Sequence, residues 1–82
     1  MGTFNKHFKD SVKRMFLFNM FRNERQFLDA FNEHFSLSCD NLDFKILNDT
    51  NARLSVDFGD MKIDLDIKIK KHDDWYIVAD VV

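Results

Sequence analysis

The apolar positions along the chain change their period once, near Cys39. Before this residue they recur every three or four positions, the spacing of one face of an α-helix. After it, apolar and polar residues alternate, which is typical of strands that bury one face. The pattern therefore predicts one α+β domain over residues 1–82, with a helical part over residues 3–36 and a sheet part over residues 42–82.

The helical part carries two apolar stripes that point in different directions. At 100° per residue, the stripe through Phe8 and Val12 and the later stripe through Phe27 and Phe31 are rotated by roughly 150° from one another. Two structures satisfy this pattern, a pair of helices or one long kinked helix whose later face meets a partner. We favour the pair, because two asparagines, which are poor helix formers, flank the point where the stripes cross.

In the helix pair, the first helix ends near Arg22 and the second begins at Asn23. The side chain of Asn23 is suited to cap the second helix, while Gln26 reaches back in a capping box.

The sheet part predicts four strands in an antiparallel meander, so the element order is ααββββ and the helices cover one face. A two-residue turn at Gly59 and Asp60 sets the register of the middle hairpin. On one face it pairs Phe58 with Met61, Val56 with Ile63 and Leu54 with Leu65. On the other face it pairs Asp57 with Lys62 and Arg53 with Asp66, and opposite charges at both places support the register.

The last strand, residues 75–82, is apolar on both faces. Trp75, Ile77, Ala79 and Val81 are predicted to face the core, and Tyr76, Val78 and Val82 the other side. In a simple meander this strand is an edge, and an edge that is apolar on both faces is normally protected or paired. It either pairs with another chain, or it inserts centrally or lies under a loop.

The run MFLFNMF, residues 15–21, has six apolar residues in seven and covers the whole circumference of a helix. A helix that packs on one sheet buries only a stripe, so the surplus predicts a contact with another protein or a second copy. The predicted partner-binding residues are Leu17, Met20, Phe21, Arg22, Arg25, Tyr76, Val78 and Val82.

The charge is distributed unevenly around a net value of −2. Residues 1–26 hold six bases and two acids, and residues 27–82 hold six bases and twelve acids. This asymmetry suggests an acidic partner for the front half, a basic partner for the back half, or two copies arranged head to tail. Alternatively, the charges simply face water.

No motif identifies a reaction, so we expect no enzyme and no cofactor. His34, Ser36, Ser38 and Cys39 crowd one segment, but spacing alone does not place a base beside a nucleophile. Lysines interleave with the aspartates of the strands, which spoils a cation site, and we expect no metal. With glycine only at positions 2 and 59, a glycine-rich phosphate loop is excluded.

The sequence favours a small non-enzymatic protein-binding domain that forms a homodimer or binds another protein. A single cysteine and the lack of a long apolar run indicate a cytoplasmic protein without a membrane partner. The Phe-, Asn-, Lys- and Asp-rich composition without proline is typical of an A/T-rich genome, which suggests an accessory or inhibitor protein of a mobile element.

Three alternatives stay open. In the first, helices and sheet enclose an apolar ligand in a cone, an architecture shared with cystatin-like and nuclear-transport-factor-like folds, although no residue motif of either is present. In the second, nucleic acid binds the basic row Lys6, Lys9, Lys13 and Arg14 of the first helix. In the third, the Asp-rich strands occupy a basic cleft as an acidic inhibitor.

Overall fold

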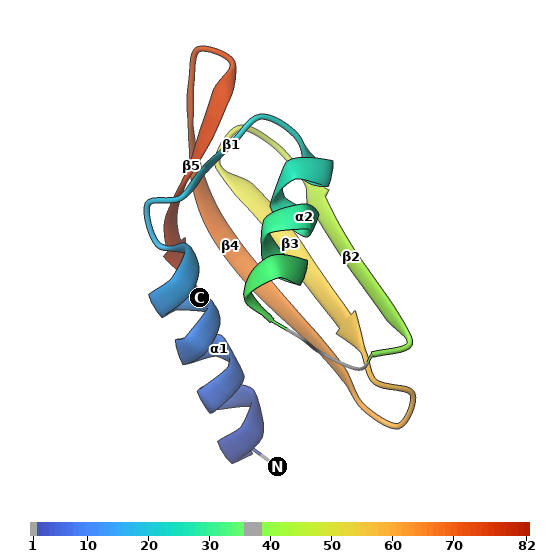
Figure 1. The fold of residues 1–82 in the computed structure, drawn as a ribbon. Coiled ribbons are helices and arrows are strands. Elements are labelled where there is room, and N and C mark those ends of the chain that lie inside the picture. Colours follow the sequence, from blue (N-terminus) through green and yellow to red (C-terminus); the bar gives the residue numbers. More distant parts are fainter. Residues whose placement is uncertain (1, 36–38) are drawn as a thin grey trace.

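Over the described residues, 2–35 and 39–82, the computed structural model shows two helices packed on one face of a five-stranded antiparallel sheet (Figure 1). Side chains are described from residue 6 onward. The elements in chain order are α1 (Gly2–Phe16), β1 (Met20–Phe21), α2 (Glu24–His34), β2 (Asn41–Ile46), β3 (Asn51–Asp57), β4 (Lys62–His72) and β5 (Trp75–Val81). The strands lie in the order β1-β5-β4-β3-β2. The predicted α+β class is confirmed.

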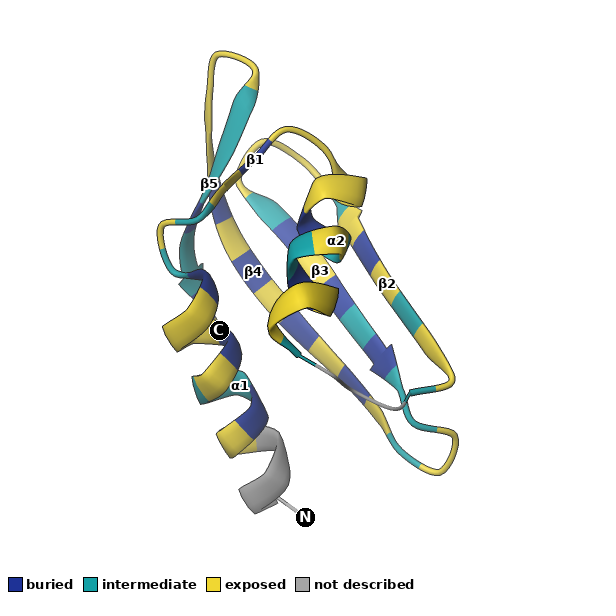
Figure 2. Cartoon of the chain, viewed as in Figure 1, coloured by how far each residue is buried: buried dark blue, intermediate teal, exposed yellow. Residues whose placement is uncertain are grey.

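Phenylalanine rings fill the space between the helices and the sheet. The rings of Phe27 on α2 and Phe44 on β2 stack with centroids 3.9 Å apart, and Phe16 on α1 packs on Phe27 at 4.9 Å. Along β3 and β4, alternate residues are buried, which Figure 2 shows as bands along the two strands. These buried residues form one cluster with the buried residues of the helices. Side chains of the opposite, outer face of these strands are polar or charged, because no helix of the described chain covers that face.

The middle hairpin has the predicted register. Val56 pairs with Ile63 and Leu54 with Leu65 on the core face. On the outer face Asp57 pairs with Lys62, and Arg53 lies opposite Asp66 with their side chains 3.3 Å apart. The turn places Gly59 at φ +94°, a conformation that glycine adopts without steric cost.

The predicted number and order of elements are wrong in one place. The first helix ends at Phe16 rather than near Arg22, and Met20 and Phe21 form a strand that pairs with Ile77 and Tyr76 of β5. The segment predicted as purely helical therefore contributes a fifth strand, and the order is αβαββββ. A two-residue strand is too short to show an alternation, so the sequence pattern gives no signal for it.

The second helix begins where the sequence predicts. Oδ1 of Asn23 accepts a hydrogen bond from the backbone N–H of Gln26 at 2.9 Å. The Gln26 side chain reaches back one residue further than in a standard capping box, and its Oε1 accepts from the N–H of Arg22 at 2.7 Å. Both bonds satisfy donors at or just before the start of the helix.

The predicted faces of β5 are wrong. Tyr76 and Val78 face the core, and Trp75 and Ile77 face outward, because His72 pairs with Trp75 across a turn of only two residues. A bulge then leaves Ala79 as an extra residue opposite Lys68 and Ile69. This extra residue returns Val81 to the core, as predicted.

The last strand is not a free edge along residues 76–78. Strand β1 pairs with it there, and the N–H of Val78 donates to the carbonyl of Asn19 at 2.9 Å. Of the two alternatives for this strand, insertion between other strands is therefore confirmed along residues 76–78, because β5 lies between β1 and β4. At the opposite edge, Oε2 of Glu24 accepts from the N–H of Ile46 on β2 at 2.7 Å, which occupies one donor of that edge.

Candidate protein-binding surface

The segment that joins α1 to β1 exposes a cluster of apolar side chains. We call residues 15–20 the elbow, and its apolar surface consists of Met15, Leu17, Phe18 and Met20. Phe18 is 72% exposed and Met20 is 53% exposed, whereas Phe16 is buried in the core. Figure 2 shows that most of this link is exposed or half-buried. The run MFLFNMF thus divides into core residues and a real apolar surplus.

Phe18 combines exposure with an unfavourable backbone conformation. Its φ is +68°, in the left-handed region, which costs an L-residue with a bulky side chain roughly 1–2 kcal/mol. The conformation is held by hydrogen bonds, since the N–H of Phe18 donates to the carbonyl of Val78 at 2.8 Å and that of Asn19 donates to Phe16 at 2.9 Å. Strained residues of this kind cluster at functional sites.

A second apolar group continues from Met20 across the outer face of the sheet. Met20 pairs with Ile77, and Ile77 pairs with Lys70 on β4. Next to this row, the guanidinium carbon of Arg22 lies 4.5 Å from the ring centroid of Trp75, a cation–π contact. We call Met20, Ile77 and Trp75 the outer row.

The predicted partner-binding residues separate into three groups. Leu17 is half-buried and Met20 exposed in the elbow, and Arg22 and Arg25 are exposed. Phe21 and Val78 are only 3% and 0% exposed, so their predicted place on the surface is wrong. Tyr76 is half-buried because it stacks on Phe21. Phe21 is buried because β1 places its ring beside the rings of Phe27 and Phe44.

Two exposed residues of the elbow, Met15 and Phe18, were not predicted as surface residues from the sequence. Met15 matches the apolar stripe of the first helix, which assigned it to the core, yet it is exposed. Phe18 belongs to neither apolar stripe, and this was the signal in the sequence that its side chain is exposed. A residue that no amphipathic face can bury is a candidate for exposure.

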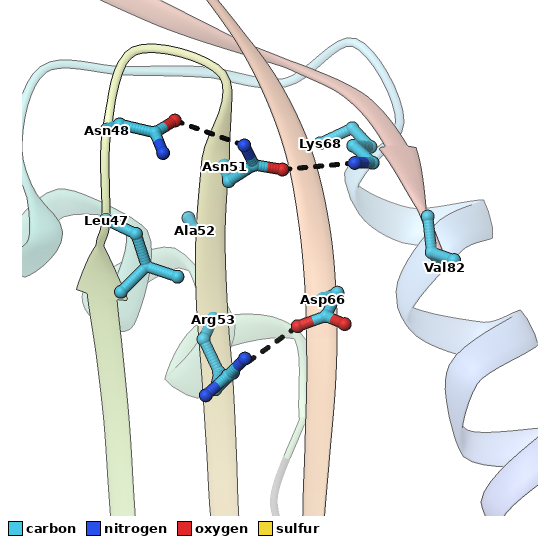
Figure 3. A pocket seen from close by; sticks show the side chains of 8 residues that line it. All are labelled: Leu47, Asn48, Asn51, Ala52, Arg53, Asp66, Lys68 and Val82. Atoms are coloured by element: carbon cyan, nitrogen blue, oxygen red, sulfur yellow. Dashed lines mark hydrogen bonds and ion pairs between the residues drawn. The ribbon is translucent and has the colours of Figure 1, made fainter.

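Val82, the last predicted surface residue, is exposed beside a shallow depression of about 290 Å³ on the outer face (Figure 3). Leu47, Asn48, Asn51, Ala52, Arg53, Asp66, Lys68 and Val82 line it. Its polar groups contact one another, since Nζ of Lys68 donates to Oδ1 of Asn51 at 3.1 Å and Arg53 bonds Asp66. Figure 3 shows both pairs among the lining side chains, so each charged side chain of the lining already has a hydrogen-bond partner.

The basic row of α1 is partly neutralised by the end of β5. Nζ of Lys13 lies 3.0 Å from Oδ1 of Asp80, and Val81 donates its N–H to the same oxygen at 2.8 Å. The hydrogen bond from Lys13, followed by that from Val81, lowers the pKa of Asp80 below its ordinary value. Lys9 is half-buried and also lies near this carboxylate. The row therefore offers less free charge to nucleic acid than its spacing suggests.

Candidates for catalysis and metal binding are not assembled in the described part of the chain. His34 packs edge-on against Phe16 at 5.6 Å and Cys39 is half-buried, while Ser36 and Ser38 lie outside the described residues. Among the residues described, no group of three His, Cys, Asp or Glu side chains can hold a metal ion.

The alternative of an apolar ligand enclosed between the helices and the sheet gains no support, because Phe rings fill the space between these two layers. A depression of about 360 Å³ lies instead on the outside of α1, lined by Asp10, Lys13, Arg14 and Leu17. None of the helices described is at once apolar and long enough to cross a bilayer.

Comparisons of the chain with protein-family models, with curated proteins and with solved structures found no match.

Proposed function

We propose that this chain is a non-enzymatic protein-binding domain whose contact surface is the elbow, extended by the outer row. The observation that carries the proposal is Phe18, a large aromatic side chain that is 72% exposed on a strained backbone. This arrangement is unfavourable for the isolated chain, because the exposed ring gains no free energy from burial while the backbone strain remains. A partner that buries the ring recovers that gain.

The shape of the surface favours a macromolecular partner over a small ligand. Small-molecule sites are concave and bury most of the ligand, whereas Phe18 and Met20 present their side chains to solvent. Exposed aromatic anchors that enter a pocket of the partner are typical of protein–protein hot spots. The apolar cluster of the elbow supports the same conclusion.

Site-specific photocrosslinking tests the proposal directly. A photoreactive phenylalanine analogue is placed at position 18 of the full chain, and the chain is illuminated both as pure protein and in the cells that produce it. We expect covalent adducts with a second copy or with one distinct protein. The matched control carries the analogue at Leu47, which is also exposed but lies outside the elbow. Equal adduct patterns at the two positions would contradict the proposal.

A double variant supplies the second test. Phe18→Ser with Met20→Ser removes the exposed apolar groups without touching the core, so the chain stays folded by circular dichroism. We expect the adducts and any concentration-dependent mass to disappear. The control pair, Leu47→Ser with Val82→Ser, removes two other exposed apolar side chains outside the elbow, so both the adducts and the concentration-dependent mass should be retained.

A further inference from the structure

The charged groups around the elbow indicate what kind of protein fits it. Arg14 borders the elbow, since it lines one depression with Leu17 and another with Met15. Arg22 lies on Trp75 beside the outer row, and Lys70 lies across β5 from Met20. Arg14 therefore lies on the helix side of the apolar side chains, and Arg22 and Lys70 lie on the sheet side. Asp10 is the acid that shares a depression with Arg14.

Among the described residues, none of these three bases forms an ion pair, whereas four other lysines and arginines do. Lys13 pairs with Asp80, Arg25 with Asp29, Arg53 with Asp66 and Lys71 with Asp49. Within the described residues, no carboxylate lies within 4.0 Å of the cationic nitrogens of Arg14, Arg22 or Lys70. The elbow is therefore an apolar cluster bordered by three bases that form no ion pair within the described residues.

The position of Arg22 is restricted by its contact with Trp75. Its guanidinium lies over the Trp75 ring at 4.5 Å, which restricts the side chain before any partner arrives. A guanidinium that stacks by its face keeps the N–H donors at its edge, and these match the two oxygens of a carboxylate. Less side-chain entropy is lost when the contact forms.

We propose that the elbow binds an acidic protein segment that carries apolar side chains, and this inference rests on the proposed function. A symmetric dimer through the same surface is disfavoured, because a two-fold interface presents the same patch from both copies. It would bring Arg14, Arg22 and Lys70 of one copy toward those of the other. Like charges across an interface are unfavourable, whereas carboxylates on a different partner complement the bases.

The test uses three labelled peptides of equal length and measures fluorescence anisotropy with the full chain. The first alternates Asp and Glu with Leu and Phe, the second replaces every acid with Lys, and the third replaces every apolar residue with Ser. We expect binding of the first peptide only, and weaker binding as salt rises. Equal binding of the basic peptide, or no binding of the acidic apolar one, would overturn the inference.

Two sets of substitutions locate the binding. Arg14→Gln, Arg22→Gln and Lys70→Gln together should weaken binding of the acidic peptide about tenfold or more, because three exposed charge contacts are lost at once. They should also flatten the salt dependence. The matched control, Lys45→Gln, Lys62→Gln and Lys68→Gln, removes the same charge from the outer face of the sheet and should leave the affinity within about twofold.

The outcome for Phe18→Ser separates this inference from the proposed function. If Phe18→Ser abolishes binding but the three glutamines do not, the elbow is the contact surface and the inference about charge is wrong. If Phe18→Ser changes nothing, the proposed function itself fails. A wild-type chain that doubles its mass through the elbow, and does so more strongly with the three glutamines, would show that the partner is a second copy.

Discussion

The ring of Phe21 on β1 stacks on the ring of Tyr76 on β5, with centroids 5.5 Å apart and planes inclined by 19°. The same two residues pair through their backbones, so side chain and main chain hold β1 at one place. The elbow, residues 15–20, directly precedes Phe21 in the chain, so the Phe21–Tyr76 contact fixes its C-terminal end. The position of the elbow therefore depends on a residue that is itself buried, since Phe21 is only 3% exposed.

Phe21→Ala should lower the free energy of unfolding by about 3–5 kcal/mol, as expected for a buried Phe. A domain of this size has a total of only about 4–12 kcal/mol, so Phe21→Asp should not fold. Urea denaturation followed by circular dichroism measures the change. Met20→Ala, one residue earlier and 53% exposed, is the control and should change the free energy by less than about 0.5 kcal/mol. Equal effects of the two alanines would contradict the assignment.

Phe18→Asn should leave the stability unchanged or raise it by up to about 1 kcal/mol, because asparagine adopts a positive φ more readily than phenylalanine. Little apolar burial is lost, since the ring is already 72% exposed. Phe16→Ala, two residues earlier in the core, should lower the free energy of unfolding by about 3–5 kcal/mol. The same denaturation experiment compares the two, and a large loss for Phe18→Asn would mean that Phe18 is structural.

Asn23→Ala should lower the free energy of unfolding by about 1 kcal/mol, because the N–H of Gln26 loses its acceptor at the start of α2. Asn23→Ser keeps an oxygen that accepts this bond and should retain most of the stability. Thermal unfolding of the two variants provides the measurement. If the alanine and serine variants unfold at the same temperature, the cap contributes nothing.

The features predicted correctly from the sequence depend on neighbours in the chain. The register of the β3–β4 hairpin follows from the Gly59–Asp60 turn and from two opposite charge pairs. The start of α2 follows from Asn23 and Gln26, three residues apart. In both cases a few adjacent residues determine the geometry, so no knowledge of the rest of the fold is required.

The features that were predicted wrongly depend on contacts between distant segments. The faces of β5 follow from a two-residue turn at Asp73, whose φ is +55°, and from the bulge at Ala79. Strand β1 exists because β5 offers it a partner more than fifty residues away. Neither a single-residue shift in turn length nor a two-residue strand leaves a mark in the apolar pattern.

The candidate site lies between these cases. The excess of apolar residues in MFLFNMF is visible in the sequence and survives as the elbow, but which members are exposed is decided by β1. Pairing with Tyr76 turns Phe21 inward, and the residue before it, Met20, then points to the outer face. The sequence thus indicated a segment with exposed apolar side chains, and it assigned Phe21 to the surface although Phe21 is buried.

Asp80→Asn should destabilise the protein at neutral pH and have progressively less effect in acid. Lys13 and the N–H of Val81 hold the pKa of Asp80 below its ordinary value of 3.8 in the folded chain. The unfolded chain therefore binds the proton more readily, so the contribution of this carboxylate is complete above about pH 4 and is lost as the pH falls through the folded pKa.

Urea denaturation of wild type and Asp80→Asn, at neutral pH and at several lower values, measures this dependence. We expect the difference between the two chains to shrink below about pH 4, and added salt to reduce it at neutral pH because both side chains of the ion pair are about half exposed. Asp43→Asn is the control, since Asp43 has no ion pair among the described residues. A difference for Asp80→Asn that persists unchanged into acid would show that the Lys13–Asp80 contact does not stabilise the fold through charge.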